Sequence, residues 1–199
     1  MERAEAITIL GIAGSLRQDS YNRAALRAVQ ALAPTGVTVE IFDLQGIPPF
    51  NQDAEQHPPV PVADLKTRMR AADAILVVTP EDNYSIPGVL KNAIDWVSRP
   101  YGDSAWDGKP VAVMGASVGT LGTARAQYHL RQVFVFLNMH ALNRPEVMIS
   151  NAAQRFDAQG ISRTPRPRTS SGSCSGILWT GRVNSGSPSG SHEGGYAYA

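Results

Sequence analysis

The chain has 199 residues, 43% hydrophobic and 18% charged, and a formal net charge of +1. These values are ordinary for one soluble domain with a sizeable core and give no electrostatic basis for binding nucleic acid or an anionic membrane. No apolar run approaches the about 18 residues that span a bilayer. The single cysteine, Cys174, allows no intrachain disulfide, and the four histidines lack metal-ligand spacing. With no apolar signal region at residues 1–5, the sequence predicts a cytoplasmic protein without a metal site.

Strand and helix patterns alternate along the first 160 residues, which we interpret as one domain. In chain order we predict a strand at 7–12, a helix at 25–32, a strand at 37–41, a surface loop at 47–61, a helix at 65–72, a strand at 74–78, a helix at 90–97, a strand at 111–114, a helix at 130–137 and a strand at 146–149. Such alternation implies parallel βαβ units with right-handed crossovers. The predicted fold is therefore α/β, with a doubly wound sheet of five parallel strands.

The loop after the first strand, residues 11–22, is rich in glycine and polar side chains. The hydroxyls of Ser15 and Ser20, the Arg17 guanidinium, the Asn22 amide and the helix-terminal N–H groups are suited to a phosphate. The loop has neither the dinucleotide fingerprint nor the Walker pattern. The alternative is an ordinary strand-to-helix turn in which Ser20 caps the helix.

Two further loops follow the third and fourth strands. Residues 79–88 form a proline-bounded loop that suits a planar heterocycle, and its candidate binding residues are Pro80, Glu81, Asn83, Tyr84 and Ser85. Residues 115–123 contain Ser117 and Gly119, where glycines let the backbone approach a flat ligand. The alternative for residues 79–88 is a helix-capping turn around Pro87, and the alternative for residues 115–123 is a flexible surface loop. Because ligands of open α/β sheets bind beyond the carboxyl ends of strands, the three loops together favour one binding site.

Three motifs in these loops resemble the NADPH-dependent FMN reductase family. The motifs are Gly14-Ser15-Leu16-Arg17 with Ser20 and Asn22-Arg23, then Pro80-Glu81-Asp82-Asn83-Tyr84-Ser85-Ile86-Pro87-Gly88, and then Gly115-Ala116-Ser117 through Arg125-Ala126-Gln127. The resemblance covers roughly residues 5 to 160. One departure is Asp82, which stands where the family's loop usually carries an aromatic residue.

The resemblance implies a flavodoxin-like fold, non-covalent FMN, NADPH or NADH as donor, a small electron acceptor such as a quinone, and a homodimer or homotetramer. No side chain is predicted to be a catalytic acid or base, because the flavin performs the redox chemistry. Structural roles are the favoured interpretation for Glu81 and Tyr84. Arg125, Tyr128 and Glu146 are candidates for contacts between subunits or for a solvated face. The alternative function is a flavodoxin-type electron carrier without nicotinamide activity, against which the near-neutral charge argues.

Residues 161–199 differ abruptly in composition from the preceding chain. They are rich in Ser, Gly, Pro and Arg and carry no helical stripe, so their composition predicts a disordered tail. A flavodoxin-like domain is expected to close with a fifth helix beside the first, and nothing in this segment can form it.

A shifted reading frame accounts for the missing helix. When each codon takes the last base of one codon and the first two of the next, any serine that is read as TCN becomes apolar. The apolar positions in that frame are 170, 171, 174, 175, 178 and 179. This is the i, i+1, i+4 period of an amphipathic helix, and GC-rich codons permit LPDPATADFLRELLRDLVDR. The tail is therefore interpreted as a frameshifted reading of the final helix, whereas a naturally disordered tail predicts no such period.

Overall fold

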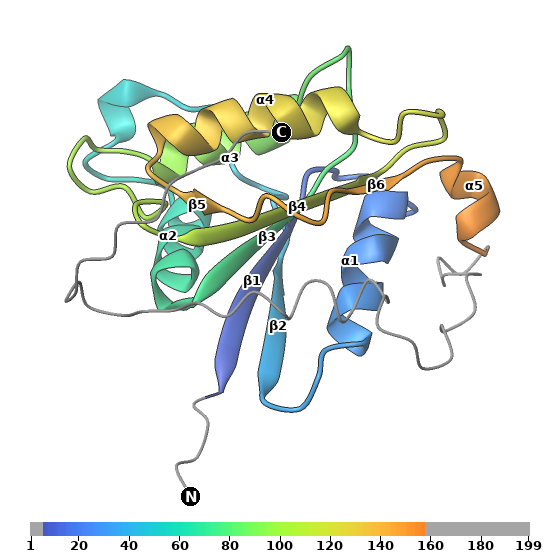
Figure 1. Cartoon of the computed structure of the whole chain (residues 1–199). Coiled ribbons are helices and arrows are strands. Elements are labelled where there is room, and N and C mark those ends of the chain that lie inside the picture. Colours follow the sequence, from blue (N-terminus) through green and yellow to red (C-terminus); the bar gives the residue numbers. More distant parts are fainter. Residues whose placement is uncertain (1–5, 158–199) are drawn as a thin grey trace, which may run out of the picture.

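The computed structural model describes residues 6–157, so the predicted tail and its frameshift lie outside the described residues. Strands and helices alternate along this part of the chain (Figure 1). The elements are β1 (Ile7–Ala13), α1 (Tyr21–Ala31), β2 (Val37–Phe42), the 3-10 turn η1 (Gln52–Ala54), α2 (Val60–Ala71), β3 (Ala74–Val78), α3 (Gly88–Val97), β4 (Pro110–Ala116), α4 (Ala124–Phe136), β5 (His140–Ala141), β6 (Val147–Ile149) and α5 (Ala152–Arg155).

All strands of the sheet are parallel, in the order β2-β1-β3-β4-β5. β6 also pairs with β4, farther along it, where Met114 faces Val147. The position of the fifth strand is therefore filled by β5 and β6 in succession. The predicted doubly wound sheet of five parallel strands is confirmed, although the sequence indicated only the β6 part, because two residues of β5 are too few to show a period.

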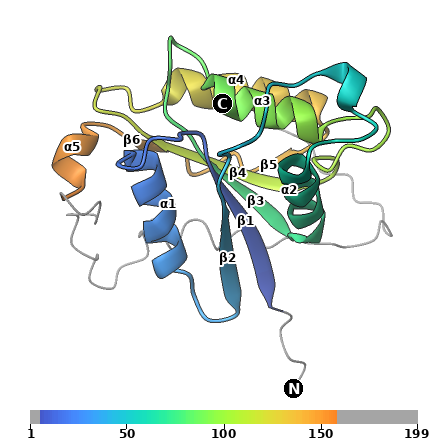
Figure 2. The same cartoon turned by 180° about the vertical axis from the view of Figure 1, so that it is seen from behind.

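Helices cover both faces of the sheet but unequally. α2, α3 and α4 lie on one face, whereas α1 and the four-residue α5 lie on the other (Figures 1 and 2). Alternate side chains of the strands point to the two faces, so Leu10, Ile75 and Val77 join the cluster under α2, α3 and α4. Leu76 and Val78 join the cluster beside α1. Among residues 6–157, no helix is long and apolar enough to cross a membrane.

Candidate functional site

The carboxyl ends of β1, β3 and β4 lead into the three loops predicted to bind a ligand. Since these strands are neighbours and parallel, the loops begin at the same edge of the sheet. Gly14 follows β1, and its N–H donates to the Val78 carbonyl at the end of β3 at 2.9 Å. A Cβ on Gly115 would collide with the Thr79 carbonyl and the Thr123 hydroxyl. The second and third loops therefore meet so closely that only glycine fits between them.

In the first loop, Ser20 is the N-cap of α1. Its Oγ accepts the Asn22 N–H at 3.2 Å. This contact agrees with the alternative interpretation of the loop as a strand-to-helix turn capped by Ser20. The half-buried Ser15 accepts the Arg17 N–H at 3.4 Å, and the exposed Arg17 guanidinium lies 5.8 Å from the centre of the Tyr21 ring. Ser15 and Arg17 thus stand before the N-terminus of α1, where the helix dipole favours an anion.

Asn22 joins the first loop to the third. Its side chain is 2% exposed, its Nδ2 donates to the Ala116 carbonyl at 2.9 Å, and its Oδ1 accepts the Ala116 N–H at 2.8 Å. Both polar atoms of the amide therefore hold the end of β4 against the start of α1. Its observed contacts position the loops of the site.

Replacing Asn22 with Ala is expected to destabilise the fold. The change removes both hydrogen bonds and leaves the buried Ala116 N–H and carbonyl without partners, at a cost of about 2 kcal/mol. For a domain of this size, that corresponds to a fall in Tm of about 4–8 °C. Calorimetry can measure it against Asn143→Ala, which removes an exposed amide. Equal melting of the two variants would contradict the role of Asn22.

The second loop contains a tight turn at residues 82–85. Asp82 and Ser85 exchange backbone hydrogen bonds of 3.0 and 2.9 Å. Both central residues adopt the left-handed conformation, with φ of 50° at Asn83 and 65° at Tyr84. Such φ values are costly for a bulky residue and persist where the surroundings fix them, which concentrates them at functional sites. The turn presents a tyrosine ring that is 68% exposed.

Glu81 connects this loop to α4. Its buried carboxylate accepts the N–H of Arg125 at 3.0 Å and of Ala126 at 3.3 Å, and it forms an ion pair with the Arg125 guanidinium. Thr123, the N-cap residue of α4, makes no side-chain cap bond of its own. Glu81 therefore caps α4 from a distant part of the sequence, in agreement with the structural role favoured for it.

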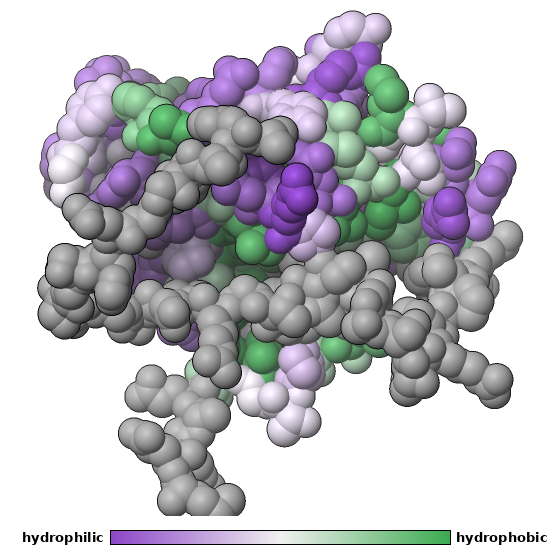
Figure 3. Space-filling model, viewed as in Figure 1, coloured by the Kyte–Doolittle hydropathy of each residue, from purple (hydrophilic) through white to green (hydrophobic). Residues whose placement is uncertain are grey.

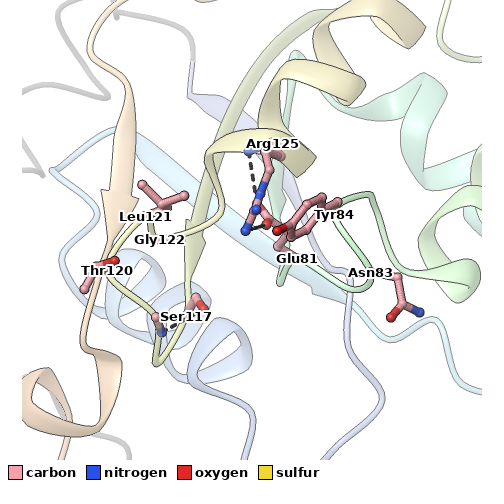
Figure 4. Close-up of a pocket in the computed structure, with 9 residues that line it drawn as sticks. Glu81, Asn83, Tyr84, Ser117, Thr120, Leu121, Gly122 and Arg125 are labelled. Atoms are coloured by element: carbon pink, nitrogen blue, oxygen red, sulfur yellow. Dashed lines mark hydrogen bonds and ion pairs between the residues drawn. The ribbon is translucent and has the colours of Figure 1, made fainter.

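Arg125 lies between Glu81 and the Tyr84 ring (Figure 4). The Arg125 guanidinium carbon is 3.6 Å from the centre of that ring, a cation–π contact. Hydrogen bonding to the Glu81 carboxylate, and more weakly to Tyr84, raises the pKa of Arg125 and keeps it cationic. Its Nε is buried without a hydrogen-bond partner among the described residues.

A pocket of about 400 Å³ opens between the second and third loops. This volume falls within the range of small-molecule sites. The lining residues are Glu81, Asn83, Tyr84, Ser117, Gly119, Thr120, Leu121, Gly122 and Arg125. Five of these were predicted from the sequence. Thr120, Leu121 and Gly122 were not among the predicted binding residues, and the pairing of Arg125 with Glu81 has no local signal.

The remaining predicted residues lie beside this pocket. The Pro80 carbonyl accepts the Thr79 hydroxyl at 2.9 Å, and the Ser85 hydroxyl lies 2.9 Å from Nδ1 of His129 on α4. Ser15, Arg17, Ser20 and Asn22 belong to the neighbouring loop after β1.

The residues present fit an FMN. The N-terminus of α1 with Ser15 and Arg17 suits a phosphate, and the pocket offers Tyr84 and the glycine-containing third loop to a flat ring. Nothing in residues 6–157 groups three His, Cys, Asp or Glu side chains as metal ligands. The donor set is therefore that of a phosphorylated planar cofactor.

Comparison with known proteins agrees with this chemistry. The model of the NADPH-dependent FMN reductase family matches residues 7–154. The chain belongs to this family. It is 56% identical to the NAD(P)H-dependent FMN reductase of Pseudomonas aeruginosa over 159 residues, which cover 79% of this chain and 85% of that protein. It is 45% identical to 2-hydroxy-1,4-benzoquinone reductase of Burkholderia sp over 155 residues, or 78% and 85% of the two chains.

The solved structure of a similar flavoenzyme supports the fold assignment. The flavoenzyme NAD(P)H:(acceptor) oxidoreductase FerB of Paracoccus denitrificans aligns with a TM-score of 0.73 and 38% identity, covering 78% of this chain and 86% of that one. The flavodoxin-like fold and the FMN reductase assignment, with FMN as cofactor and NAD(P)H as reductant, are thereby confirmed.

The contacts of Arg125, Tyr128 and Glu146 lie within the chain. Arg125 contacts Glu81 and Tyr84, while the Tyr128 hydroxyl donates to the Glu146 carboxylate at 3.3 Å. Asp82 is exposed at the turn, beside the pocket-lining residues Glu81 and Asn83.

Proposed function

We propose that this FMN reductase passes electrons from NAD(P)H to a small quinone-type acceptor at the carboxyl ends of β1, β3 and β4. The observation that carries the proposal is the convergence of three loops on one edge of the sheet, with an anion-type site beside a pocket of about 400 Å³. When bound there, FMN supplies the hydride chemistry, which needs no acid or base from the protein.

The side chains are assigned to binding and orientation. Ser15, Arg17 and the capped N-terminus of α1 hold the phosphate, with Ser20 and Asn22 fixing the loop. The ring lies against the second and third loops, where the candidates are Pro80, Glu81, Asn83, Tyr84, Ser85, Ser117 and Gly119. Glu81 acts there by fixing Arg125 and the start of α4, so that the two walls of the pocket keep their spacing.

One active site is expected to serve both half-reactions. Purified holoprotein should oxidise NADPH or NADH with a quinone present and show ping-pong kinetics, because one flavin would serve both half-reactions. Stopped-flow absorbance at about 450 nm follows reduction of the flavin by the nucleotide, and re-oxidation by the quinone is measured in a second mixing step.

The alternative function is decided in the same experiment. A flavodoxin-type carrier would hold FMN but leave its absorbance unchanged on mixing with either nucleotide. The formal net charge of +1 favours the reductase, since carriers of that kind are strongly acidic. If neither nucleotide bleaches the flavin, the reductase proposal is wrong and the carrier remains.

The proposal includes a homo-oligomer in the cytoplasm. At the C-terminal end of α4, Val135 and Phe136 are 81% and 77% exposed and form an apolar patch (Figure 3). Contiguous apolar surface of this kind is typical of contacts between proteins, and sedimentation of the purified protein can test for a homodimer or homotetramer. The single cysteine, Cys174, is compatible with a reducing compartment.

A further inference from the structure

The proposed function leaves Asp82, in the turn of the second loop, without a role. Its backbone N–H and carbonyl exchange hydrogen bonds with Ser85, and its side chain is exposed. Within the part of the chain that the structure describes, neither an ion pair nor a side-chain hydrogen bond engages its carboxylate. The turn therefore carries a negative charge that no neighbouring group of the protein neutralises.

Asp82 lies at the edge of the pocket, whichever way its side chain turns. Its chain neighbours Glu81 and Asn83 both line the pocket (Figure 4). Consecutive Cα atoms are about 3.8 Å apart, so a molecule in the pocket lies on the order of 10 Å from the Asp82 carboxylate. This distance equals the Debye length at about 0.1 M salt, so the charge still acts on such a molecule at ordinary ionic strength.

The other charges around the pocket offset each other. Among the described lining residues, Glu81 and Arg125 are the charged ones, and they form an ion pair. Arg17 of the first loop is assigned to a phosphate, whose charge of about −1.5 to −2 more than neutralises it. The chain as a whole, with a formal net charge of +1, supplies no strong field. Asp82 therefore sets the sign of the local potential, which is negative.

Apolar surface surrounds the same pocket. The side chains of Tyr84 and Leu121 line it and are largely exposed, as is Val118 of the third loop. Exposed aromatic and aliphatic side chains at a pocket favour a flat apolar molecule. A negative charge beside such a surface suits a flat ring system that carries a positive charge.

We propose that Asp82 selects electron acceptors by charge, so that aromatic quinones with a cationic group are preferred to those with an anionic group. The inference rests on the proposed function, since it names the acceptor class of the same site. The overall reaction is unchanged: the quinone gains two electrons and one proton from NAD(P)H and one proton from solvent, and becomes a hydroquinone. Asp82 acts on the approach and binding of the acceptor, through the charge that it places beside the pocket.

The test uses three naphthoquinones: a neutral parent, a sulfonate derivative and a trimethylammonium derivative. The holoprotein is first reduced with stoichiometric dithionite, and stopped-flow absorbance follows its re-oxidation by each quinone, so that no nucleotide takes part. Each rate constant is divided by that of the neutral quinone. These ratios are then compared between a variant and the unmodified protein, which cancels the intrinsic reactivity of each quinone.

Asp82→Asn is expected to slow re-oxidation by the cationic quinone and to accelerate re-oxidation by the anionic one, by about two- to fivefold each. Asp82→Glu should keep the preference, and Asp82→Lys should reverse it. The matched control is Asp107→Asn, which removes an exposed carboxylate just before β4, at the opposite edge of the sheet and about 20 Å from the pocket. This control should leave the ratios unchanged.

Binding without electron transfer gives a second measurement. A naphthyl trimethylammonium and a naphthalene sulfonate, which are not reduced by the flavin, are titrated onto the oxidised holoprotein with flavin absorbance as the signal. The unmodified protein should bind the cation more tightly, and Asp82→Asn should reduce this preference. In 1 M salt, where the Debye length is about 3 Å, the unmodified protein should lose most of the preference.

Failure of this inference differs from failure of the proposed function. If neither nucleotide reduces the flavin, the reductase proposal fails, while re-oxidation of the dithionite-reduced protein still tests Asp82. If Asp82→Asn does not hold FMN, the salt dependence of the unmodified protein decides alone. Unchanged ratios in Asp82→Asn, an equal change in Asp107→Asn, or a preference that does not respond to salt would overturn the proposal.

Discussion

Replacing Ser15 and Arg17 together with Ala is expected to weaken FMN binding at least a hundredfold. Both residues precede the N-terminus of α1, where Ser15 is already oriented by the Arg17 N–H. A hydrogen bond to a charged group contributes about 1.5–3 kcal/mol, so losing one from each residue costs about 3–6 kcal/mol. Since about 1.4 kcal/mol corresponds to tenfold in Kd, the lower figure already gives two orders of magnitude.

Fluorescence titration of the apoprotein with FMN measures this change. The matched control is Arg27→Ala, which removes a cation from the exposed face of the same helix, away from its N-terminus. It alters net charge in the same way as Arg17→Ala, so it corrects for general electrostatic attraction. A Kd that rises equally in the control and the double variant, or stays unchanged in both, would exclude this loop as the phosphate site.

The sequence predicted the framework of the fold because each strand carries its own signal. β3 was predicted with its observed bounds, Ala74–Val78, since a strand covered on both faces is apolar throughout. α2 begins at Val60, inside the predicted surface loop, because Pro59 and Pro61 resemble loop residues although proline is well tolerated in a first helical turn.

The site was predictable as a set of loops but not as a set of contacts. Strand ends and glycines are local features, and they indicated all three loops. The contact between Asn22 and Ala116 joins residues 94 apart in the chain, and that between Glu81 and Arg125 joins residues 44 apart. Polar pairs of this kind have no periodicity, so only the packed sheet reveals that both side chains organise the loops.

The left-handed backbone at Asn83 and Tyr84 also could not be predicted from the sequence. Asparagine adopts positive φ readily, but tyrosine does so at a cost, and no sequence pattern signals it. In the structure the Tyr84 ring rests on Arg125, which Glu81 holds in place. The conformation of the turn therefore depends on a carboxylate that precedes it, which leads to the variant with the second large expected effect.

Glu81→Ala is expected to destabilise the protein and weaken FMN binding together. The Glu81 side chain is 6% exposed and accepts two backbone N–H groups at the start of α4, so its loss leaves both donors without that partner. Two charge-assisted bonds of this kind correspond to about 3 kcal/mol at the lower end of their range. Net stability is about 5–15 kcal/mol, and Tm should fall by about 6–12 °C.

The matched control is Asp64→Ala, which removes an exposed carboxylate paired with Arg68 one helical turn away on α2. Surface pairs of this type contribute about 0.3–0.5 kcal/mol, so its Tm should change by at most about 2 °C. Melting with and without saturating FMN separates the loss of stability from the loss of FMN binding. A variant whose pocket walls have lost their spacing binds FMN less tightly, so FMN raises its Tm by less. If Glu81→Ala melts like Asp64→Ala and binds FMN with the original Kd, then Glu81 does not position the second loop against α4.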